Sequence, residues 1–271
     1  MMFYIESLDG KRHNLESMGI KPLNLEIESL SPITFMETLD GGDGHIDLGT
    51  TFEGRRMKAT FAILSKDSFD FNLARNEVFR LLNTRSFFYV ISKYEPQKRW
   101  KVKPTSSFAP EKINHRTGTF DVQLQSNSPY VESIGTTLNP LTFEAEKWQV
   151  GQGLITENVE YVNSKSVFKI YNAGDVEIDP RQFPLKIKYQ GKSNRFTIKN
   201  ETTGDMFIYY GTTGVNDTLL LDGIRTLKNG TSVFKDTNKK LITLKQGWND
   251  FTLIGASGSF LVSFDFRYYY I

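Results

Sequence analysis

The dominant pattern in this sequence is a strict alternation of apolar and polar residues. In residues 55–63 the apolar positions are Met57, Ala59, Phe61 and Ile63. The same alternation recurs at Trp100 and Val102 and again over residues 120–125. A period of two places successive side chains on opposite faces of a strand. These segments are therefore predicted to be half-buried β-strands.

One segment follows a helical period instead. In residues 70–83 five apolar residues fall on one stripe of a helix, and three asparagines and Arg80 lie opposite. The stripe consists of Phe71, Ala74, Val78, Leu81 and Leu82. We predict a helix over Asp70–Asn83 with Ser68 or Asp70 as its N-terminal cap.

A turn-rich stretch, IGTTLNPL at residues 134–141, interrupts the pattern. Its proline lacks a backbone donor and its glycine relaxes the chain. We therefore predict two domains, residues 1–136 and 137–271. Short, regularly spaced strands dominate the second domain, which is typical of a β-sandwich or barrel. They are predicted at 167–171, 185–189, 196–199, 206–210, 219–221, 241–244, 250–254 and 259–270.

The last of these strands, FLVSFDFRYYY at residues 260–270, has the strongest alternation. Phe260, Val262, Phe264 and Phe266 share one face with two tyrosines. Because an unpaired edge strand this long and apolar would aggregate, we expect it to be central or covered.

Composition narrows the class of protein. The chain has 271 residues, no cysteine and a net charge of +2, with 33 basic and 31 acidic side chains. Stability must then come from packing without disulfides. The even charge argues against a nucleic-acid partner, and no apolar run would cross a membrane. No secretion signal is recognised at the N-terminus, which predicts residence in a cytoplasm.

No pattern of catalytic residues emerges. The three histidines, His13, His45 and His115, lack the spacing of a zinc site, and no nucleotide-binding loop is present. The sequence DGGDG at residues 40–44 lacks the ligand spacing of a calcium loop. We predict no catalytic residues, no metal, no cofactor and no enzymatic activity. The alternative is a carbohydrate-binding or glycan-processing sandwich protein in which Trp100, Trp148 or Trp248 stacks on sugars.

Several stretches in sequence order resemble the distal tail protein family of long-tailed (siphovirus-type) bacteriophages or a prophage relative. They are FYIESLDGKRHNLESMGIKPLNLEIESLSP, DGGDGHIDLGTTFEGRRMKATFAI, SKYEPQKRWKVKP and NSPYVES in the first part of the chain, and GTTGVNDTLLLDGIRTLKNGTSVF and LKQGWNDFTLIGASGSFLVSFDFRYYY in the second. The likeness spans almost the whole chain.

The resemblance implies a mainly β fold with two β-sandwich-like domains, the first carrying one helix and an extended arm, the second galectin-like. It further implies a homohexameric ring at the virion tail tip, assembled in the host bacterial cytoplasm. The first domain would form the ring. The second would dock the adsorption apparatus. The implied partners are the tail tube protein, the tape-measure protein and tail-associated lysin or baseplate proteins.

The glycine-rich stretch before residue 55 fits this assembly. A loop with four glycines between Glu37 and Thr51 has no obvious partner in its own chain. A neighbouring subunit of a closed ring would supply that partner. We predict an inter-subunit arm comprising Asp40, Asp43, His45, Ile46, Asp47 and Leu48. Ile46 and Leu48 would be the apolar anchors, and Asp43 and Asp47 would meet basic groups. The alternative is a solvated hairpin tip that touches nothing.

Overall fold

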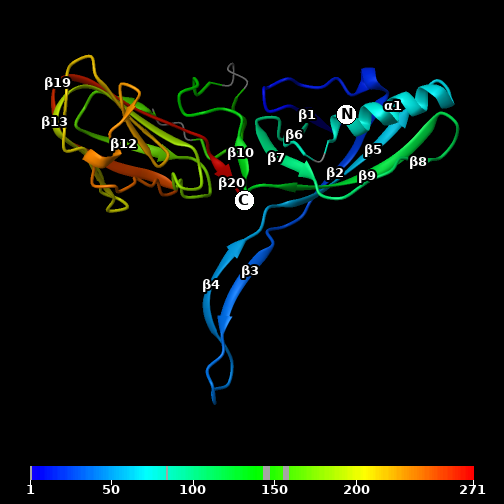
Figure 1. Cartoon of the computed structure of the whole chain (residues 1–271), viewed down its shortest axis with the longest axis horizontal. Helices are drawn as coiled ribbons and strands as arrows, with labels where there is room; N and C mark the ends of the chain where they lie inside the picture. Colours follow the sequence, from blue (N-terminus) through cyan, green and yellow to red (C-terminus); the bar gives the residue numbers. More distant parts are fainter. Residues whose placement is uncertain (1, 84, 143–146, 155–158) are drawn as a thin grey trace. The chain divides into compact units, whose positions relative to one another are not determined.

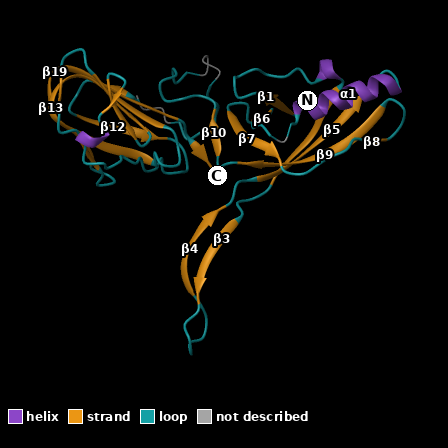
Figure 2. Cartoon of the chain, in the orientation of Figure 1, coloured by secondary structure: helices purple, strands orange, loops and turns teal. Residues whose placement is uncertain are grey.

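A computed structural model describes residues 2–83, 85–142, 147–154 and 159–271. The chain divides into two compact units, one ending at Glu132 with Ile271 added and the other spanning Ser133–Tyr270. Strands dominate both units, and α1 is the one α-helix in the described part of the chain (Figures 1 and 2). The predicted mainly β class with a single helix is confirmed. No helix in the described residues is long and apolar enough to span a bilayer.

The first unit is built on an antiparallel sheet with the strand order β1-β6-β7-β9-β5-β2, to which β8 adds beside β9. Its strands are β1 (Phe3–Glu6), β2 (Ile20–Ile27), β5 (Arg56–Leu64), β6 (Phe88–Ser92), β7 (Lys98–Pro104), β8 (Glu111–Lys112) and β9 (Thr117–Ser126). A 3-10 turn, η1 (Glu16–Met18), precedes β2, and β10 (Val131–Ser133) crosses the boundary between the units.

The core of this unit lies on the face predicted from the alternation. Met57, Ala59, Phe61 and Ile63 are at most 1% exposed. The ring of Phe61 stacks on Phe120 at 5.1 Å between centroids. The helix α1 (Ser68–Leu81) covers this face, because the Phe71 ring lies so close to Gly118 of β9 that a Cβ there would be 2.8 Å from it.

The helix begins two residues earlier than predicted, and the predicted cap was wrong. Asp67 is the N-cap: its carboxylate accepts hydrogen bonds from the amides of Phe69 (2.8 Å) and Asp70 (2.9 Å). The carboxylate of Asp70 in turn accepts from the amide of Lys66 at 2.9 Å. Of the neighbouring capping residues, Asp67 takes the role because its backbone is extended, with φ −154°.

The second unit holds a sheet in the order β11-β19-β13-β16-β17-β18, with β12 beside β19 and with β14 and β15 beside β13. The strands of this sheet are β11 (Val162–Asn163), β12 (Val167–Asn172), β13 (Leu185–Asn200), β14 (Met206–Ile208), β15 (Thr212–Thr213), β16 (Thr218–Asp222), β17 (Arg225–Lys228), β18 (Thr231–Ser232) and β19 (Gly247–Phe266). The short strand β20 (Tyr269–Tyr270) follows β19 and is not part of this sheet. A short 3-10 turn, η3 (Phe234–Asp236), follows β18.

Two pairs of predicted strands are in fact single long strands. Residues 185–189 and 196–199 both belong to β13, and residues 250–254 and 259–266 both belong to β19. The glycines between them bend the ladder instead of ending it. At Gly255, with φ +81°, a Cβ would lie 2.3 Å from the Asn194 carbonyl oxygen. The predicted strand at 241–244 was wrong, since only Leu244 forms an isolated bridge, to Ile178.

The strongest predicted strand is interior to its sheet, as expected. β19 lies between β11 and β13, and Val262, Phe264 and Phe266 are at most 2% exposed. β19 ends at Phe266, but the alternation of buried and less buried residues continues to Tyr268 and breaks at Tyr269, which is buried next to it.

Candidate functional site: a projecting hairpin arm

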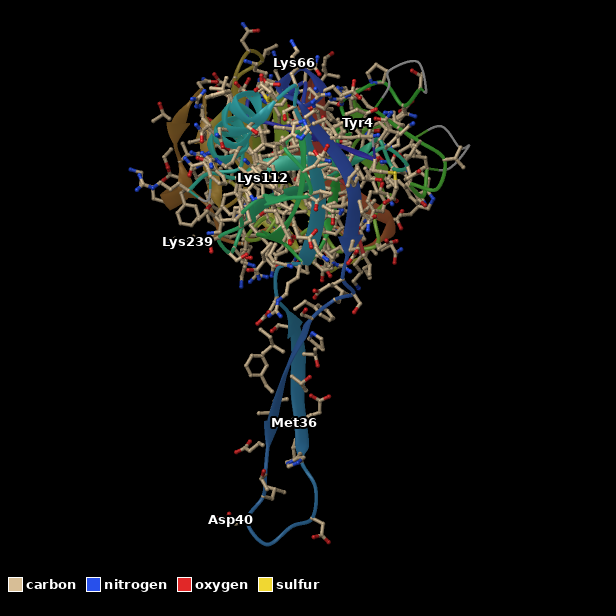
Figure 3. The ribbon with its side chains drawn as sticks, turned by 90° about the vertical axis from the view of Figure 1, so that its right-hand side faces the viewer. Tyr4, Met36, Asp40, Lys66, Lys112 and Lys239 are labelled. Carbon is tan, nitrogen blue, oxygen red and sulfur yellow. The ribbon has the colours of Figure 1, made fainter. Side chains whose placement is uncertain are left out.

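Between β2 and β5 the chain forms a two-stranded hairpin that joins neither sheet. β3 (Pro32–Glu37) pairs antiparallel with β4 (Ile46–Phe52), and the two make up a sheet of their own. We call residues 29–53 the arm. Figure 1 shows it extending away from the first unit's sheet, and Figure 3 shows Met36 and Asp40 along it with no other segment against them. The sequence predicted a glycine-rich loop here and missed both strands.

Every residue from Pro32 to Phe52 is exposed to solvent. Large apolar side chains are among them, and Phe35, Met36 and Leu48 are 51%, 59% and 60% exposed. The complete apolar set is Ile33, Phe35, Met36, Leu39, Ile46, Leu48 and Phe52. An isolated hairpin is marginally stable in water, and an apolar surface of this kind marks a site of interaction.

The apolar side chains occupy both faces of the hairpin. Residues paired across an antiparallel ladder share a face. The pairings Phe35 with Gly49 and Glu37 with Ile46 put Ile33, Phe35 and Ile46 on one face. The pairing of Pro32 with Phe52 puts these two residues, together with Met36, on the other. Both faces therefore offer contacts to a partner.

The predicted site residues gather at the far end of the arm. Asp40, Asp43 and His45 lie in the loop that joins the strands, and Ile46, Asp47 and Leu48 begin β4. The Nδ1 of His45 is 3.2 Å from the Thr38 hydroxyl, and the Asp47 carboxylate accepts from the Gly49 amide at 2.8 Å. Leu48 occupies the register shift of the ladder, which lies opposite Phe35 and Met36. The role predicted for these residues stays a prediction.

The root of the arm is fixed by Arg55, which is only 6% exposed. Its Nη1 donates to the Glu28 carbonyl at 3.0 Å, and its Nε donates to the Pro129 carbonyl at 3.0 Å. Its amide donates to the Ser126 hydroxyl at 2.9 Å, and its guanidinium lies 5.4 Å from the Trp100 ring centre. Burial lowers the pKa of Arg55 below its usual value. Arg55 thus ties together the two ends of the arm, a role that no sequence pattern indicated.

The neighbouring residue, Gly54, packs so closely against β9 that it leaves no space for a side chain. A Cβ at this position would lie 2.0 Å from the Ser126 carbonyl oxygen, so no other residue fits without moving β9. The Glu28 amide donates to the Arg56 carbonyl and the Glu53 amide donates to the Ser31 carbonyl, both at 3.0 Å. These two hydrogen bonds join the strands at the base of the hairpin. The arm therefore has a rigid base and an unsupported tip.

The arm is also the most acidic part of the chain. Residues 29–53 contain five carboxylates and no lysine or arginine. Because the whole chain has a net charge of +2, the remaining residues carry +7. The partner of such a segment should offer positive charge as well as apolar surface.

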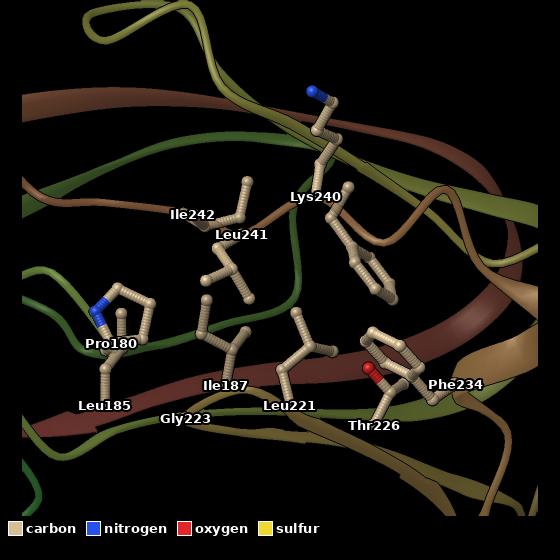
Figure 4. A pocket seen from close by; sticks show the side chains of 11 residues that line it. Pro180, Leu185, Ile187, Leu221, Gly223, Thr226, Phe234, Lys240, Leu241 and Ile242 are labelled. Carbon is tan, nitrogen blue, oxygen red and sulfur yellow. The ribbon is translucent and has the colours of Figure 1, made fainter.

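Two hollows among the described residues of the second unit differ in size and exposure. The first, shown in Figure 4, lies among Ile187, Leu221, Phe234 and Ile242 and has a volume of about 10 Å³. It has room for about one water molecule and none for a larger ligand. The second is an open hollow of about 400 Å³ beside Trp248, Glu160 and Lys165.

The three tryptophans differ in how far their rings are exposed to a possible ligand. Trp100 and Trp148 are 6% and 3% exposed, so neither can stack on a ligand. Trp248 is half-buried, and its ring centre lies 5.0 Å from that of Tyr171. Within the described residues, no cluster of three His, Asp or Glu side chains is arranged to hold a metal.

Comparisons with known proteins agree with this architecture. Residues 9–126 match the model of the phage tail protein RIFT-related domain. The crystal structure of the Dit protein (gp 19.1) of phage SPP1 superposes with a TM-score of 0.72 at 11% identity, covering 99% of this chain and 100% of that one. No curated protein matched the sequence.

Two structures of the phage p2 baseplate in its activated conformation, with Ca and with Sr, match at 10% and 11% identity. They cover 97% and 98% of this chain and 97% of theirs. Their TM-scores of 0.48 and 0.49 are too low to establish a shared fold.

The first unit is thus a phage tail domain, and the whole chain has the fold of a phage hub protein. Residues 9–126 thus match a phage tail protein family, and the whole chain shares the fold of SPP1 Dit; both findings support the resemblance to distal tail proteins seen in the sequence. The two findings support a structural role in the tail or baseplate.

Proposed function

We propose that the chain forms a closed ring of six identical subunits at the tip of the phage tail, where it joins the tail tube to the adsorption apparatus. The structure of SPP1 Dit, whose fold this chain shares, is described as a paradigm of hub adsorption apparatus in phages that infect Gram-positive bacteria. Head-to-tail contacts around a closed rotation satisfy every copy equally. An arm that reaches the next copy is such a contact.

The observation that carries this proposal is the combination of a fixed root and a bare apolar tip. An arm that served only its own subunit would bury some of its side chains there, yet residues 32–52 are all exposed. Fully burying a wholly exposed large aliphatic side chain contributes about 1.5–3 kcal/mol. Because Ile46 and Leu48 are 43% and 60% exposed, together they would contribute about 1.5–3 kcal/mol per junction. Because the hairpin is already formed, docking orders less chain than fixing a flexible loop would.

Each predicted arm residue then has a role. Ile46 and Leu48 are the apolar anchors, and Asp43 and Asp47 meet cations of the neighbouring subunit. Asp40 and His45 lie at the turn and set how far the tip reaches. Phe35 shares the face of Ile46 and extends the anchored surface toward the root.

The decisive experiment shortens the arm. Replacing Asp40–Thr50 with a short Gly/Ser linker should leave the thermal stability of the subunit nearly unchanged and abolish rings. Negative-stain images and light scattering measure assembly. A less drastic variant, Ile46→Ser with Leu48→Ser, should weaken assembly in the same direction.

The matched control replaces two equally exposed aliphatic residues of the second unit. Val215 and Ile224 are 65% and 60% exposed, and Val215→Ser with Ile224→Ser should leave assembly intact. If the shortened protein assembles as the wild type does, the arm is not the junction.

The remaining assignments follow from the same proposal. The first domain, 1–136, forms the ring, and the second domain, 137–271, is the galectin-like platform. The tail tube, the tape-measure protein and a tail-associated lysin or baseplate protein are the neighbours in the virion. The ring assembles in the host cytoplasm. It acts without enzymatic activity, so purified protein should not hydrolyse cell-wall polymer or nucleotides above a heat-killed control.

A second candidate function rests on the open hollow of the second unit. An aromatic ring beside charged side chains is a common way to hold a sugar, and Trp248 offers this next to Glu160 and Lys165. Titration with host cell-wall glycans tests it. Binding that disappears in Trp248→Ala and persists in Trp100→Phe would favour a carbohydrate-binding role.

A further inference from the structure

The first unit carries a basic counterpart to the acidic arm. Residues 85–104, which lead into and include β6 and β7, contain six lysines and arginines and one glutamate. We call this segment the basic hairpin. Lys98 pairs with Glu95 at 2.7 Å, and Arg99 pairs with Glu132 at 2.7 Å. These ion pairs neutralise Lys98 and Arg99, so the remaining cations of the segment are the ones that could bind a partner.

Lys101 and Lys103 are the available cations. Their Nζ atoms lie 5.5 and 5.3 Å from the centre of the same ring, that of Phe87. Within the described residues, neither lysine forms an ion pair with a carboxylate. Two ammonium groups beside one aromatic ring make a compact positive site with an apolar component.

The strand geometry keeps this site facing outward. Lys101 and Lys103 alternate along β7 with Trp100 and Val102, which are 6% and 0% exposed. Lys103 lies opposite Gln125 of β9, and Gln125 lies opposite Arg56 of β5. A polar row thus crosses three strands beside the two lysines.

The arm tip has the complementary character. Glu37, Asp40, Asp43 and Asp47 lie on or next to the turn, and within the described residues none of them pairs with a cation of the chain. Two charges 4 Å apart near a protein surface attract with about 4 kcal/mol before desolvation is counted. Such pairs set register and orientation, while apolar anchors supply most of the affinity.

We infer that Phe87, Lys101 and Lys103 of one copy receive the acidic tip of the arm of a second copy. The inference rests on the proposed ring and names the surface that completes its junction. The carboxylates of Asp43 and Asp47 contact the two ammonium groups, and the apolar side chains next to them contact the Phe87 ring.

Charge reversal tests the docking surface. We compare Asp43→Lys with Asp47→Lys, Lys101→Glu with Lys103→Glu, and the chain that carries all four changes. The control is Lys188→Glu with Lys192→Glu, two exposed lysines of β13. The concentration at half-assembly is measured by light scattering, and circular dichroism verifies that each variant is folded.

At 50 mM salt, each reversal at the junction should raise the concentration at half-assembly by about tenfold or more, because like charges then meet. The four-change chain should recover to within about threefold of the wild type, and the control should stay within about twofold. At 500 mM salt the effect of each reversal should shrink to about threefold or less, because salt screens exposed charges.

The absence of cysteine from the chain allows a direct test of proximity. Asp43→Cys protein is mixed with Lys103→Cys protein, so any cross-link joins two copies. A bis-maleimide linker is used, because a disulfide would need Cα atoms within about 7 Å. A cross-linked dimer is expected, and Lys188→Cys in place of Lys103→Cys should give none.

The outcomes separate this inference from the proposed function. A wild type that never assembles contradicts the self-assembled ring. A wild type that assembles while the lysine reversals have no effect contradicts only the docking surface. Cross-linking no stronger than in the Lys188→Cys control also overturns the docking surface.

Discussion

Two pairs of strands in this molecule have the same kind of pairing, but one pair is buried and the other is exposed to solvent. β13 with β19 and β3 with β4 are both antiparallel, and both ladders contain register shifts. In the first pair, Phe251 and Phe264 are fully buried. In the second, Phe35 is 51% exposed and every other residue is exposed as well. Alternation alone does not distinguish them.

The difference lies in what surrounds each pair. β19 has neighbouring strands on both edges, and its Phe264 ring packs 4.9 Å from Phe251 and 5.9 Å from Phe168 of β12. Among the described residues, no third strand pairs with the arm, and residues 32–52 are all exposed. An exposed apolar hairpin with a rigid base indicates that the missing layer belongs to another molecule. This contrast predicts how mutations in the two pairs should differ.

The largest expected difference is between equivalent truncations in the two pairs. Phe264→Ala should lower the free energy of unfolding of the second unit by about 3–5 kcal/mol, because it leaves a cavity among stacked rings. Phe35→Ala should change stability by less than about 0.5 kcal/mol in the unassembled subunit. Urea unfolding followed by tryptophan fluorescence measures both. A stability loss in Phe35→Ala comparable to that in Phe264→Ala would mean that the arm packs on its own chain.

A second prediction concerns how much Ser133 stabilises the residues that follow β19. The Ser133 amide donates to the Tyr268 carbonyl at 2.9 Å, and the Tyr268 amide donates back to the Ser133 hydroxyl at 3.1 Å. Nη1 of Arg267 donates to the Ser133 carbonyl at 2.8 Å. A fragment of residues 133–271 should therefore be more stable than one of residues 137–271 by about 2–4 kcal/mol, at about 1 kcal/mol per hydrogen bond.

Chemical unfolding of the two fragments checks this, and it also tests the domain boundary predicted after residue 136. Equal stability would support that boundary. Failure of both fragments to fold would contradict independent domains.

The third prediction concerns the root that separates the arm from the packed sheet. Arg55→Met should destabilise the first unit by about 2–4 kcal/mol, since it removes two hydrogen bonds from a buried cation to carbonyl groups. Hydrogen exchange should rise at Glu28 and Glu53. Arg56→Met is the matched control, because Arg56 is exposed and, within the part of the chain that the structure describes, its side chain forms an ion pair with Glu53 alone, at 2.9 Å. Equal effects of the two variants would refute the anchoring role of Arg55.

The sequence predicted the fold correctly where the apolar face of a segment is also the face that is buried in the folded protein. The face of Met57, Ala59 and Phe61 is buried as expected, because β2 and β9 flank β5 and a helix covers it. Glycines misled the prediction of strand ends, since Gly191 and Gly255 form bends inside β13 and β19. Whether a glycine ends a strand or bends it depends on the neighbouring strand, which no local pattern reveals.

The sequence singled out the arm as a segment but did not predict its structure, and its role as a site stays a prediction. The glycines at 41, 42 and 44 form the turn, and the strands on either side were missed because their apolar residues face solvent. The alternation of Ile33 with Phe35 was the available signal. Arg55 and the pair of Lys101 and Lys103 gave no signal, because their partners are distant in sequence.

The smallest predicted effect is on the pH dependence of stability. It depends on Asp217, whose carboxylate is held by several hydrogen-bond donors, whereas the carboxylates of the arm are not, within the part of the chain that the structure describes. Asp217 accepts hydrogen bonds from the Gly214 amide (2.8 Å) and the Asn229 side chain (2.7 Å), and Lys228 lies 3.0 Å away. These donors, led by the Gly214 amide, lower the pKa of Asp217 from 3.8 to about 2. In the described residues, Asp43 of the arm has no comparable set of donors.

The pH dependence follows from the direction of this shift. Because the folded pKa lies below the unfolded one, the stabilisation by Asp217 is complete above pH 3.8 and is lost as the pH falls toward 2. NMR titration of the Asp217 carboxyl should give a midpoint near 2, and Asp217→Asn should flatten the loss of stability of the second unit over that range. Asp43→Asn is the control and should leave that loss unchanged. A midpoint near 3.8 would show that the turn does not hold the carboxylate, and the contrast between this turn and the arm would then disappear.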